Sequence, residues 1–400
     1  MKRYWVVGAL FLLSMITYID RVCISTAKDP VARDLGLSDS AMGMVFSAFA
    51  LGYALAQIPS GWFADRFGPR IALTLVVTAW SGLTALTGAS WNVVSLLLIR
   101  FLFGVGEAGA FPGSARAIGN WLPAGERGRA NGILFSGSRL GAAFAFPLLA
   151  WMLARWNWRT TFLLLGVAGA VWAVAWLTWF RDHPRTPVQT TAPAASPHFG
   201  IRDVFRSGAI GLAMTQYFAS NFTFFICLSW MLPYLKKQYR LADTEAASYA
   251  MAPLLLGAAS QWVTGFLVDR LYRTRWRAWS RRIPGIIGFA LAAIGVLAVT
   301  RAATPAGAVL CFTLAAFGAD MTISPSWVYC ADIAGKNVGS VSGSMNMLGN
   351  FGSFVSANAF PYLQRATGSA STYFYAAAAL NIIGIACWFR MRSVEQERIS

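Results

Sequence analysis

The sequence predicts an all-α membrane protein with twelve transmembrane helices in two pseudo-symmetric six-helix bundles. Of its 400 residues, 56% are hydrophobic and only 12% are charged, whereas soluble domains average about 25% charged residues. Twelve apolar segments are long enough to cross the roughly 30 Å hydrocarbon core of a bilayer as helices. Several features of the first six segments recur in the second six, which indicates a duplicated unit.

The twelve expected spans fall into two groups of six. They cover residues 4–27, 41–63, 71–90, 93–118, 130–153 and 159–180, and then 208–235, 246–268, 283–300, 306–330, 338–362 and 371–390. We therefore expect an N-terminal bundle over 1–180, a cytoplasmic linker over 181–207, and a C-terminal bundle with a short cytoplasmic tail over 208–400. Both histidines, His183 and His198, fall in the linker, which excludes a histidine proton relay in the membrane.

Membrane topology accounts for the net charge of +17, so nucleic-acid binding is not expected. With the N-terminus in the cytoplasm, twenty Lys and Arg residues fall on the cytoplasmic side and nine on the other. The positive-inside bias therefore predicts a multi-pass protein with both termini in the cytoplasm. The first apolar segment runs into Asp20 without a small-residue cleavage site, so a cleaved signal peptide is not expected.

Short motifs repeat between the two halves at nearly constant offsets. The segment 61–70, which follows the second span, is echoed by 265–271 after the eighth span. Weaker echoes match Gly132 and Gly141 with Gly343 and Gly352, and Glu107 and Pro112 with Asp320 and Pro325. A duplicated six-helix unit is typical of transporters that hold their substrate at the bilayer midplane.

Four charged residues lie inside membrane-length apolar segments: Asp20 and Arg21 in the first span, and Arg100 and Glu107 in the fourth. Charge at this depth costs about 3 kcal/mol or more, so such residues normally face a polar interior and are functional. Adjacent helical residues point about 100° apart, so Asp20 and Arg21 cannot simply satisfy each other.

Arg100 and Glu107 lie on one helix face, two turns apart. This spacing corresponds to about 10 Å along the axis, which is too far for an easy direct contact. Gly104 and Gly106 lie between them, and we expect these glycines to leave room for water or a ligand group.

The segment 61–70 resembles the signature loop of the major facilitator superfamily, Gly-x-Leu-Ala-Asp-Arg-x-Gly-Arg-Arg/Lys. Here Phe63 replaces the leucine and Pro69 replaces the first basic residue. Within that superfamily, the Tyr-Ile-Asp-Arg run ending at Arg21, the Arg100 to Glu107 spacing, and the Glu-Ala-Gly-Ala-Phe-Pro run resemble the anion:cation symporter family. The resemblance covers essentially the whole chain and is strongest to bacterial proton-coupled galactonate, hexuronate and glucarate carriers.

The residue types and the resemblance together lead to a hypothesis for the site. Arg21 is expected to hold the substrate carboxylate, because a guanidinium donates two parallel hydrogen bonds to it. Glu107 is expected to carry the coupled proton, with Asp20 as a second proton site, while Arg100 tunes Glu107 or shares the substrate. By repeat position, Asp320 is a further proton site or a neutral core acid. The alternative is that the four charges form only a buried ion network.

Neutral polar and aromatic residues are expected to complete the pocket, because amides and hydroxyls suit sugar hydroxyls and rings suit C–H surfaces. These residues are Tyr53, Tyr217, Asn221, Ser324, Trp327, Asn346 and Asn350. The resemblance implies sugar-acid contacts for Tyr53, Ser324, Trp327 and Asn346. Ordinary helix–helix packing is an equal alternative for each residue. Arg139, in the fifth span, contacts a second anionic group or extends to an interface.

A gate is expected at the cytoplasmic ends of the second and eighth spans. Asp65 can neutralise a neighbouring helix N-terminus or pair with an arginine, and Gly61, one turn earlier, allows close backbone approach. We interpret one set of residues as a lock that holds the bundles together: Gly61, Asp65, Arg66, Gly68, Arg70, Asp269 and Arg270. The alternative is a topology anchor with solvated charges.

The sequence contains no motif typical of an enzyme. A phosphate-cradling Gly-x-x-x-x-Gly-Lys loop is missing, so ATP is not the expected energy source. The five scattered cysteines predict neither a disulfide framework nor a metal site. We expect a monomer in the bacterial cytoplasmic (inner) membrane, surrounded by lipid, which takes up a small organic anion with the proton as coupling ion and no cofactor. The alternatives are a proton-coupled antiporter that exports amphiphiles and a transporter-like anion sensor.

Overall fold

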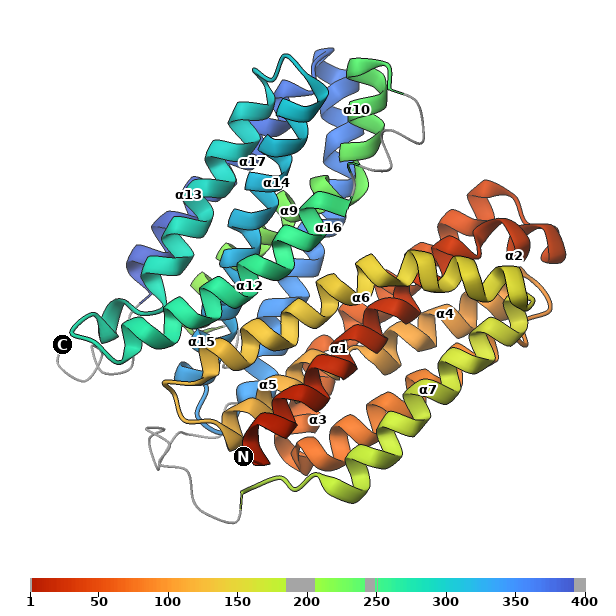
Figure 1. The fold of residues 1–400 in the computed structure, drawn as a ribbon, viewed down its shortest axis with the longest axis horizontal. Helices are drawn as coiled ribbons and strands as arrows, with labels where there is room; N and C mark the ends of the chain where they lie inside the picture. Colours follow the sequence, from red (N-terminus) through yellow and green to blue (C-terminus); the bar gives the residue numbers. More distant parts are fainter. Residues whose placement is uncertain (1, 185–205, 242–248, 250, 392–400) are drawn as a thin grey trace. The chain divides into compact units, whose positions relative to one another are not determined.

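The computed structural model describes residues 2–184, 206–241, 249 and 251–391. Within these ranges every regular element is a helix, and no strand occurs (Figure 1). Contacts divide the chain into two compact units. The first comprises Met1–Leu122, Gly137–Gln189 and Lys336–Gly343, and the second comprises Pro123–Ser136, Thr190–Gly335 and Ser344–Ser400. Most of the expected linker, residues 185–205, lies outside the described residues.

The first unit is built around one long helix. Its elements are α1 (Lys2–Thr26), α2 (Lys28–Leu35), α3 (Asp39–Thr87), α4 (Val93–Glu107), α5 (Ala110–Trp121), α7 (Trp158–Trp179), and the part of α6 (Arg127–Arg155) from Gly137 onward. Helix α3 packs against α4, α5 and α7, and α1 packs against α5 and α7. The short helix α2 was not expected from the sequence, because it is amphipathic and too short to span a bilayer.

Helix α3 contains the second and third expected spans, which join at a single residue. Gly68 has φ 80° and ψ 153°, and the residues on both sides of it are helical. A Cβ at position 68 would lie 2.7 Å from the carboxylate of Asp182, and that carboxylate accepts a hydrogen bond from the backbone N–H of Arg70 at 2.8 Å. The expected loop is therefore one glycine break, which a residue with a side chain would occupy only under strain.

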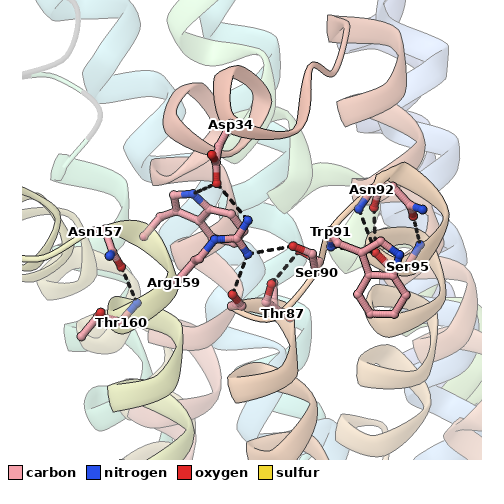
Figure 2. Close-up of polar contacts among 11 residues, drawn as sticks. Asp34, Thr87, Ser90, Trp91, Asn92, Ser95, Asn157, Arg159 and Thr160 are labelled. Atoms are coloured by element: carbon pink, nitrogen blue, oxygen red, sulfur yellow. Dashed lines mark hydrogen bonds and ion pairs between the residues drawn. The ribbon is translucent and has the colours of Figure 1, made fainter.

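A polar network closes the end of the first unit where α3 ends and α7 begins (Figure 2). The guanidinium of Arg159 donates to the carbonyls of Gly88 and Ser90 at 2.9 and 2.7 Å, and to Asp34 at 3.0 Å. Asn92 and Asn157 cap the N-termini of α4 and α7 with their side-chain oxygens. These contacts satisfy backbone groups that helix ends leave without partners.

The second unit packs around an aromatic core. It holds α9 (Gly208–Ser229), α10 (Met231–Tyr239), α12 (Met251–Tyr272), the 3₁₀ turn η1 (Arg277–Trp279), α13 (Arg282–Val299), α14 (Pro305–Met321), α15 (Ile323–Ile333), α17 (Ser371–Arg390), the start of α6, and α16 (Val338–Thr367) from Ser344 onward. Phe222, Phe312, Phe360, Tyr373 and Phe374 are buried together in one cluster. Helix α13 packs against α14 and α17, and α9 packs against α14 and α17.

The described helices account for the twelve expected spans. Nine are long and apolar enough to cross a membrane, and one of these, α3, contains two spans. Helices α9 and α10 add another, which bends by 46° near Trp230 where the sequence predicted a continuous helix over 208–235. The last is α16, whose 30 residues include a Ser-, Gly- and Asn-rich stretch that lowers its hydropathy.

Candidate functional site

The four intramembrane charges lie together in the first unit. Arg21 of α1 donates from Nε to Oε1 of Glu107 on α4 and forms an ion pair with it. Arg100 interacts electrostatically with Asp20, Glu107 and Arg21. Among the described residues, neither carboxylate oxygen of Asp20 nor Nε of Arg100 has a hydrogen-bond partner. The expectation that neither sequence-local pair satisfies itself is confirmed, and the contact that does form joins the two helices.

Aromatic rings surround the two guanidinium groups. The ring centroids of Tyr53, Tyr18 and Phe49 lie 4.4, 5.1 and 5.3 Å from the guanidinium carbon of Arg21. Arg100 lies 4.4 Å from the ring of Phe103 and 5.2 Å from that of Phe49. Each such contact attracts a cation by about 0.5–2 kcal/mol, which partly compensates for lost hydration. Tyr18 and Phe49 were not predicted, although Tyr18 lies one helical turn before Arg21.

One side of Arg21 remains reachable. Its side chain is 18% exposed, whereas that of Glu107 is 0% exposed. Oε2 of Glu107 has no hydrogen-bond partner in the described part of the chain. The carboxylate of Glu107 is therefore held from one side by Arg21, while part of the Arg21 side chain stays accessible to solvent.

Glycines bring α3 and α4 close together beside this cluster. A Cβ on Gly104 would lie 2.7 Å from the backbone N of Tyr53, and one on Gly52 would collide with the carbonyl oxygen of Phe101. A Cβ on Gly106 would lie 3.4 Å from the backbone N of Trp80 on α3. The prediction that Gly104 and Gly106 leave room for water or a ligand is wrong, because the backbone and side chains of α3 fill that space.

Asp20 lies in a buried polar environment that includes part of α3. Asp20 is 1% exposed, and neither of its carboxylate oxygens has a hydrogen-bond partner among the described residues. Trp80 Nε1 and Thr84 Oγ1, which lie near this carboxylate, are also buried and have no partner in the same part of the structure. Sequence reasoning missed Trp80 and Thr84, since nothing in their local pattern distinguishes them from packing residues.

Asp65 binds the N-terminus of another helix, as the sequence predicted. Its carboxylate accepts from the backbone N–H groups of Gly339 and Ser340 at 2.8 and 2.7 Å, and from Ser340 Oγ at 2.8 Å. A Cβ on Gly61 would collide with the Gly339 carbonyl oxygen, which confirms the expected close approach. Arg116, which was not predicted, places its Nε 3.9 Å from Asp65.

Asp269 repeats this arrangement in the second unit. It accepts from the backbone N–H groups of Gly128 and Arg129 at 2.9 and 3.0 Å, and from Arg129 Nε at 3.0 Å. Gly265 packs against Gly128 there, as Gly61 packs against Gly339. The paired positions differ by 204 residues on the aspartate helices and by 211 on the partner helices. The contacts therefore follow the internal repeat.

The arginines of the signature loop have other partners. Arg70 donates to the Leu177 carbonyl at 3.0 and 2.7 Å, which ties α3 to the end of α7. The guanidinium carbon of Arg66 lies 5.4 Å from the ring centroid of Trp62 and 5.8 Å from that of Phe67.

Arg270 is exposed at the end of α12. Arg127 and Arg281 share Asp332 at 3.3 and 3.1 Å. Sequence reasoning did not identify this ion network, because its members are far apart in the chain.

The predicted polar residues of the second unit divide between contacts that join two helices and contacts within one helix. Trp327 Nε1 donates to the Tyr217 hydroxyl at 2.9 Å, and Ser324 Oγ donates to the Gly128 carbonyl at 2.8 Å. Asn221 and Asn350 each donate to a carbonyl one turn earlier on their own helix, at 2.9 and 2.7 Å.

Three further predicted polar residues are buried. Asn346, on α16, and Asp320, on α14, are 7% and 0% exposed. Arg139, in the first unit, is 6% exposed, which argues against its extension to an interface. No group of three His, Cys, Asp or Glu side chains in the described ranges could hold a metal ion.

Comparison with known proteins places the chain among membrane transporters. The family model of the Major Facilitator Superfamily matches residues 10–357. The chain is 34% identical to the probable sulfoacetate transporter SauU of Cupriavidus necator, over 96% of this chain and 92% of that protein. It is 30% identical to the probable galactarate/D-glucarate transporter GudP of Bacillus subtilis, over 92% and 87%. The hexuronate transporter of Bacillus subtilis is 29% identical, over 93% and 90%.

Solved structures show the same fold. The proton:xylose symporter XylE superposes with a TM-score of 0.79 at 13% identity, covering 98% of this chain and 96% of that one. The fucose:proton symporter FucP of Escherichia coli gives a TM-score of 0.75 at 12% identity, covering 98% and 99%. The twelve-helix fold, the family model and the named relatives agree: this chain belongs to the Major Facilitator Superfamily and is a transporter, not an enzyme.

Proposed function

We propose that the chain couples proton entry to uptake of a small organic anion, a sugar acid or a related carboxylate, by alternating access. The relatives named for sulfoacetate, galactarate, glucarate and hexuronate all carry small anions with at least one acidic group. The observation that carries the proposal is the Arg21–Glu107 ion pair, in which Glu107 is fully buried and Arg21 is partly accessible.

This geometry makes the proton and the anion interdependent. A substrate carboxylate needs the donors of Arg21, and Glu107 occupies some of them. Protonation of Glu107 removes the negative charge that holds the guanidinium, so Arg21 can turn its donors to the substrate. When the proton leaves, the Glu107 carboxylate competes for Arg21 again and favours release of the anion. Anion and proton therefore bind and leave together.

Asp20 and Arg100 adjust the balance of charge around this pair. Arg100 interacts electrostatically with both carboxylates, and Asp20 interacts with Glu107 and Arg100. Binding a proton at Asp20 changes the potential at Glu107 without a direct contact, since charges interact strongly in a site of low dielectric constant. We therefore assign Asp20 the role of a second proton site.

The remaining expectations form part of the same proposal. Asp65 and Asp269 act as reversible locks on the helix N-termini that they bind, because a carboxylate neutralises the partial positive charge there. Polar side chains of the second unit contribute neutral contacts to the anion; the residues are Tyr217, Asn221, Ser324, Trp327, Asn346 and Asn350. The bundles cover 1–180 and 208–400, and both termini of the monomer lie on the cytoplasmic side of the inner membrane.

The test is transport by the Glu107→Gln variant in liposomes. A gradient of one pH unit supplies about 1.4 kcal/mol per proton, enough for about tenfold accumulation. Wild-type protein should therefore accumulate labelled sulfoacetate or galactarate when the outside is acidic. Glu107→Gln should lose this accumulation but retain counterflow exchange, because an amide is always neutral and leaves Arg21 available.

Asp29→Asn is the matched control, because Asp29 is an exposed carboxylate outside the cluster. It should accumulate the anion like the wild type. Accumulation by Glu107→Gln in response to the pH gradient would refute the assignment of the coupled proton to Glu107. Failure of every organic acid to exchange would refute anion transport itself.

A further inference from the structure

A cavity of about 260 Å³ lies in the second unit, between the last turns of α16 and the junction of α9 with α10. Its lining is four apolar or aromatic residues and three polar ones: Trp230, Pro233, Tyr234 and Phe360, and Lys237, Gln238 and Gln364. Small-molecule sites typically combine aromatic walls with a few polar groups, and they measure about 300–1,000 Å³ for drug-sized ligands. This cavity has that composition and a size suited to a smaller molecule.

Two prolines shape the cavity. Pro361, inside α16, has no N–H and so cannot donate to the carbonyl of Ala357 one turn earlier. The indole Nε1 of Trp230 donates to that carbonyl at 3.0 Å, and its ring stacks on Phe360 with the centroids 5.3 Å apart. Pro233 removes a helical hydrogen bond in the same way, and the chain bends by 46° near Trp230. A hydrogen bond and a ring contact therefore hold the indole in one orientation at the bend.

The residues at the start of α10 turn one face toward the cavity. Trp230, Pro233, Tyr234 and Lys237 follow the spacing i, i+3, i+4, i+7, which brings side chains to the same side of a helix. The ring of Tyr234 packs edge-on against two rings of the aromatic core, with centroids 5.5 and 5.6 Å away. This packing fixes the face of α10 that carries Lys237, so the ammonium group lies on the same side as the indole.

Within the described ranges, the three polar side chains of the lining make no hydrogen bond or ion pair. Lys237 and Gln238 are exposed, and Gln364 is half-buried. An ammonium group can donate to a carboxylate, and each amide offers both donors and an acceptor to a hydroxyl group. No acidic side chain is among the described residues that line the cavity. Its charge is therefore positive, which favours an anion.

The cavity is separate from the predicted substrate contacts on the same two helices. Trp230 follows Asn221 by nine residues, and on α16 Phe360 follows Asn350 by ten. A rise of 1.5 Å per residue places the cavity about 14–15 Å farther along both helix axes. The proposed topology puts these helix ends at the outer face of the membrane.

We propose that this cavity is a second binding site, which takes a small hydroxylated carboxylate. Lys237 binds a carboxylate oxygen, and Gln238 and Gln364 bind hydroxyl groups. The face of Trp230 packs against the C–H groups of the carbon chain. Its place at the outer face rests on the proposed function, whereas binding at this site requires neither Arg21 nor transport.

Equilibrium dialysis of labelled galactarate against the full-length protein in detergent tests the proposal. The Arg21→Gln variant removes the guanidinium of the transport site, so the galactarate that it still binds reports the second site. Adding Lys237→Gln should weaken this binding at least about tenfold, as expected for loss of one hydrogen bond to a charged group. Adding Gln364→Leu should weaken it about fivefold. Gln364→Leu should leave the weaker binding of adipate unchanged, because adipate has the same six carbons and two carboxylates but no hydroxyl groups.

Lys236→Gln is the matched control, because it removes the same charge from the neighbouring position, which does not line the cavity. In the Arg21→Gln background it should keep the affinity for galactarate, and thermal unfolding of each variant checks that it is folded. Three results would overturn the proposal: no binding to Arg21→Gln, unchanged binding after Lys237→Gln, or equal losses in Lys236→Gln and Lys237→Gln. Equal affinities of Arg21→Gln for galactarate and adipate would overturn the assignment to a hydroxylated ligand. None of these results bears on accumulation by the wild type or its loss in Glu107→Gln, so the proposed function is tested separately.

Discussion

Two arginines of the first unit show opposite ways to place charge in a helical membrane protein. Arg159 is 38% exposed and donates to Asp34 and to two backbone carbonyls. Arg100 is 1% exposed, and its Nε has no hydrogen-bond partner among the described residues. The first arrangement joins α2, α3 and α7 (Figure 2). The second takes Nε of Arg100 out of water without giving it a hydrogen-bond partner, which costs stability.

The acids of the two regions differ in the same way. Asp34 Oδ2 accepts from Trp158 Nε1 at 3.1 Å and from Arg159 at 3.0 Å. Asp20 has no such partner in the part of the chain that the structure describes. Satisfied charges are typical of sites that hold helix ends together, whereas charged residues buried within transmembrane helices typically mark functional sites. We therefore expect substitutions to affect stability in the first region and coupling in the second.

The largest expected effect on transport in this comparison is that of Asp20→Asn. It should abolish accumulation driven by a pH gradient, because an amide cannot carry the second proton. The free energy of unfolding should change by about 1 kcal/mol or less, since no hydrogen bond or ion pair of a described residue is removed. Uptake into liposomes and thermal unfolding on the same preparation measure both quantities.

The same substitution at Asp34 is the matched control, and it should leave accumulation unchanged. Trp80→Phe tests the environment of Asp20. If Trp80 Nε1 donates to the ionised carboxylate during the cycle, this variant should shift the pH dependence of uptake without loss of folding. If Asp20→Asn accumulated the anion as well as the wild type does, Asp20 would not carry a coupled proton, and its lack of hydrogen-bond partners would not indicate a functional site.

Arg159→Ala should have a smaller effect on transport and a larger effect on stability. It removes three hydrogen bonds from a charged donor, of which two satisfy carbonyls after the end of α3, so we expect a loss of about 2–3 kcal/mol. Below the unfolding temperature, accumulation of the anion should be preserved. Arg155→Ala is the control, because Arg155 is exposed on the same end of the unit, and it should change stability by about 0.5 kcal/mol or less.

Periodicity and composition predicted the spans and the repeat because both depend on side-chain hydrophobicity along the chain. Local spacing also showed that Arg100 and Glu107 cannot pair easily. It could not show that Arg21 reaches Glu107 from another helix, because a contact between α1 and α4 depends on how the helices pack. The wrong prediction that Gly104 leaves room for water or a ligand has the same origin. A glycine indicates that something approaches the backbone closely, but the sequence does not show whether this is a ligand or another helix.

The contacts of Asp65 and Asp269 with helix N-termini were easier to predict than the surroundings of Asp20. Asp65 lies at a helix end after Gly61, and this pattern occurs again at Asp269 and Gly265, so the sequence carries the signal twice. Trp80 and Thr84 have no comparable signal, because they are two ordinary residues of an apolar helix that are distinctive only beside Asp20. The bend near Trp230 did carry a signal that was overlooked: Pro233 has no backbone N–H to bond the carbonyl four residues earlier, so the helix breaks just before it.

The smallest expected effect is that of Asp34→Asn on stability, and a double-mutant cycle with Arg159→Ala isolates it. The pair is 48% and 38% exposed, so solvent screens the attraction and the coupling energy should be about 0.5–1 kcal/mol. The amide oxygen can still accept from Trp158, which limits the loss further. Thermal unfolding of the two single variants and the double variant measures the coupling. A coupling energy above about 3 kcal/mol would mean that the Asp34–Arg159 pair behaves like a buried ion pair. The two regions would then differ only in how deeply their charges are buried, and not in whether those charges have hydrogen-bond partners.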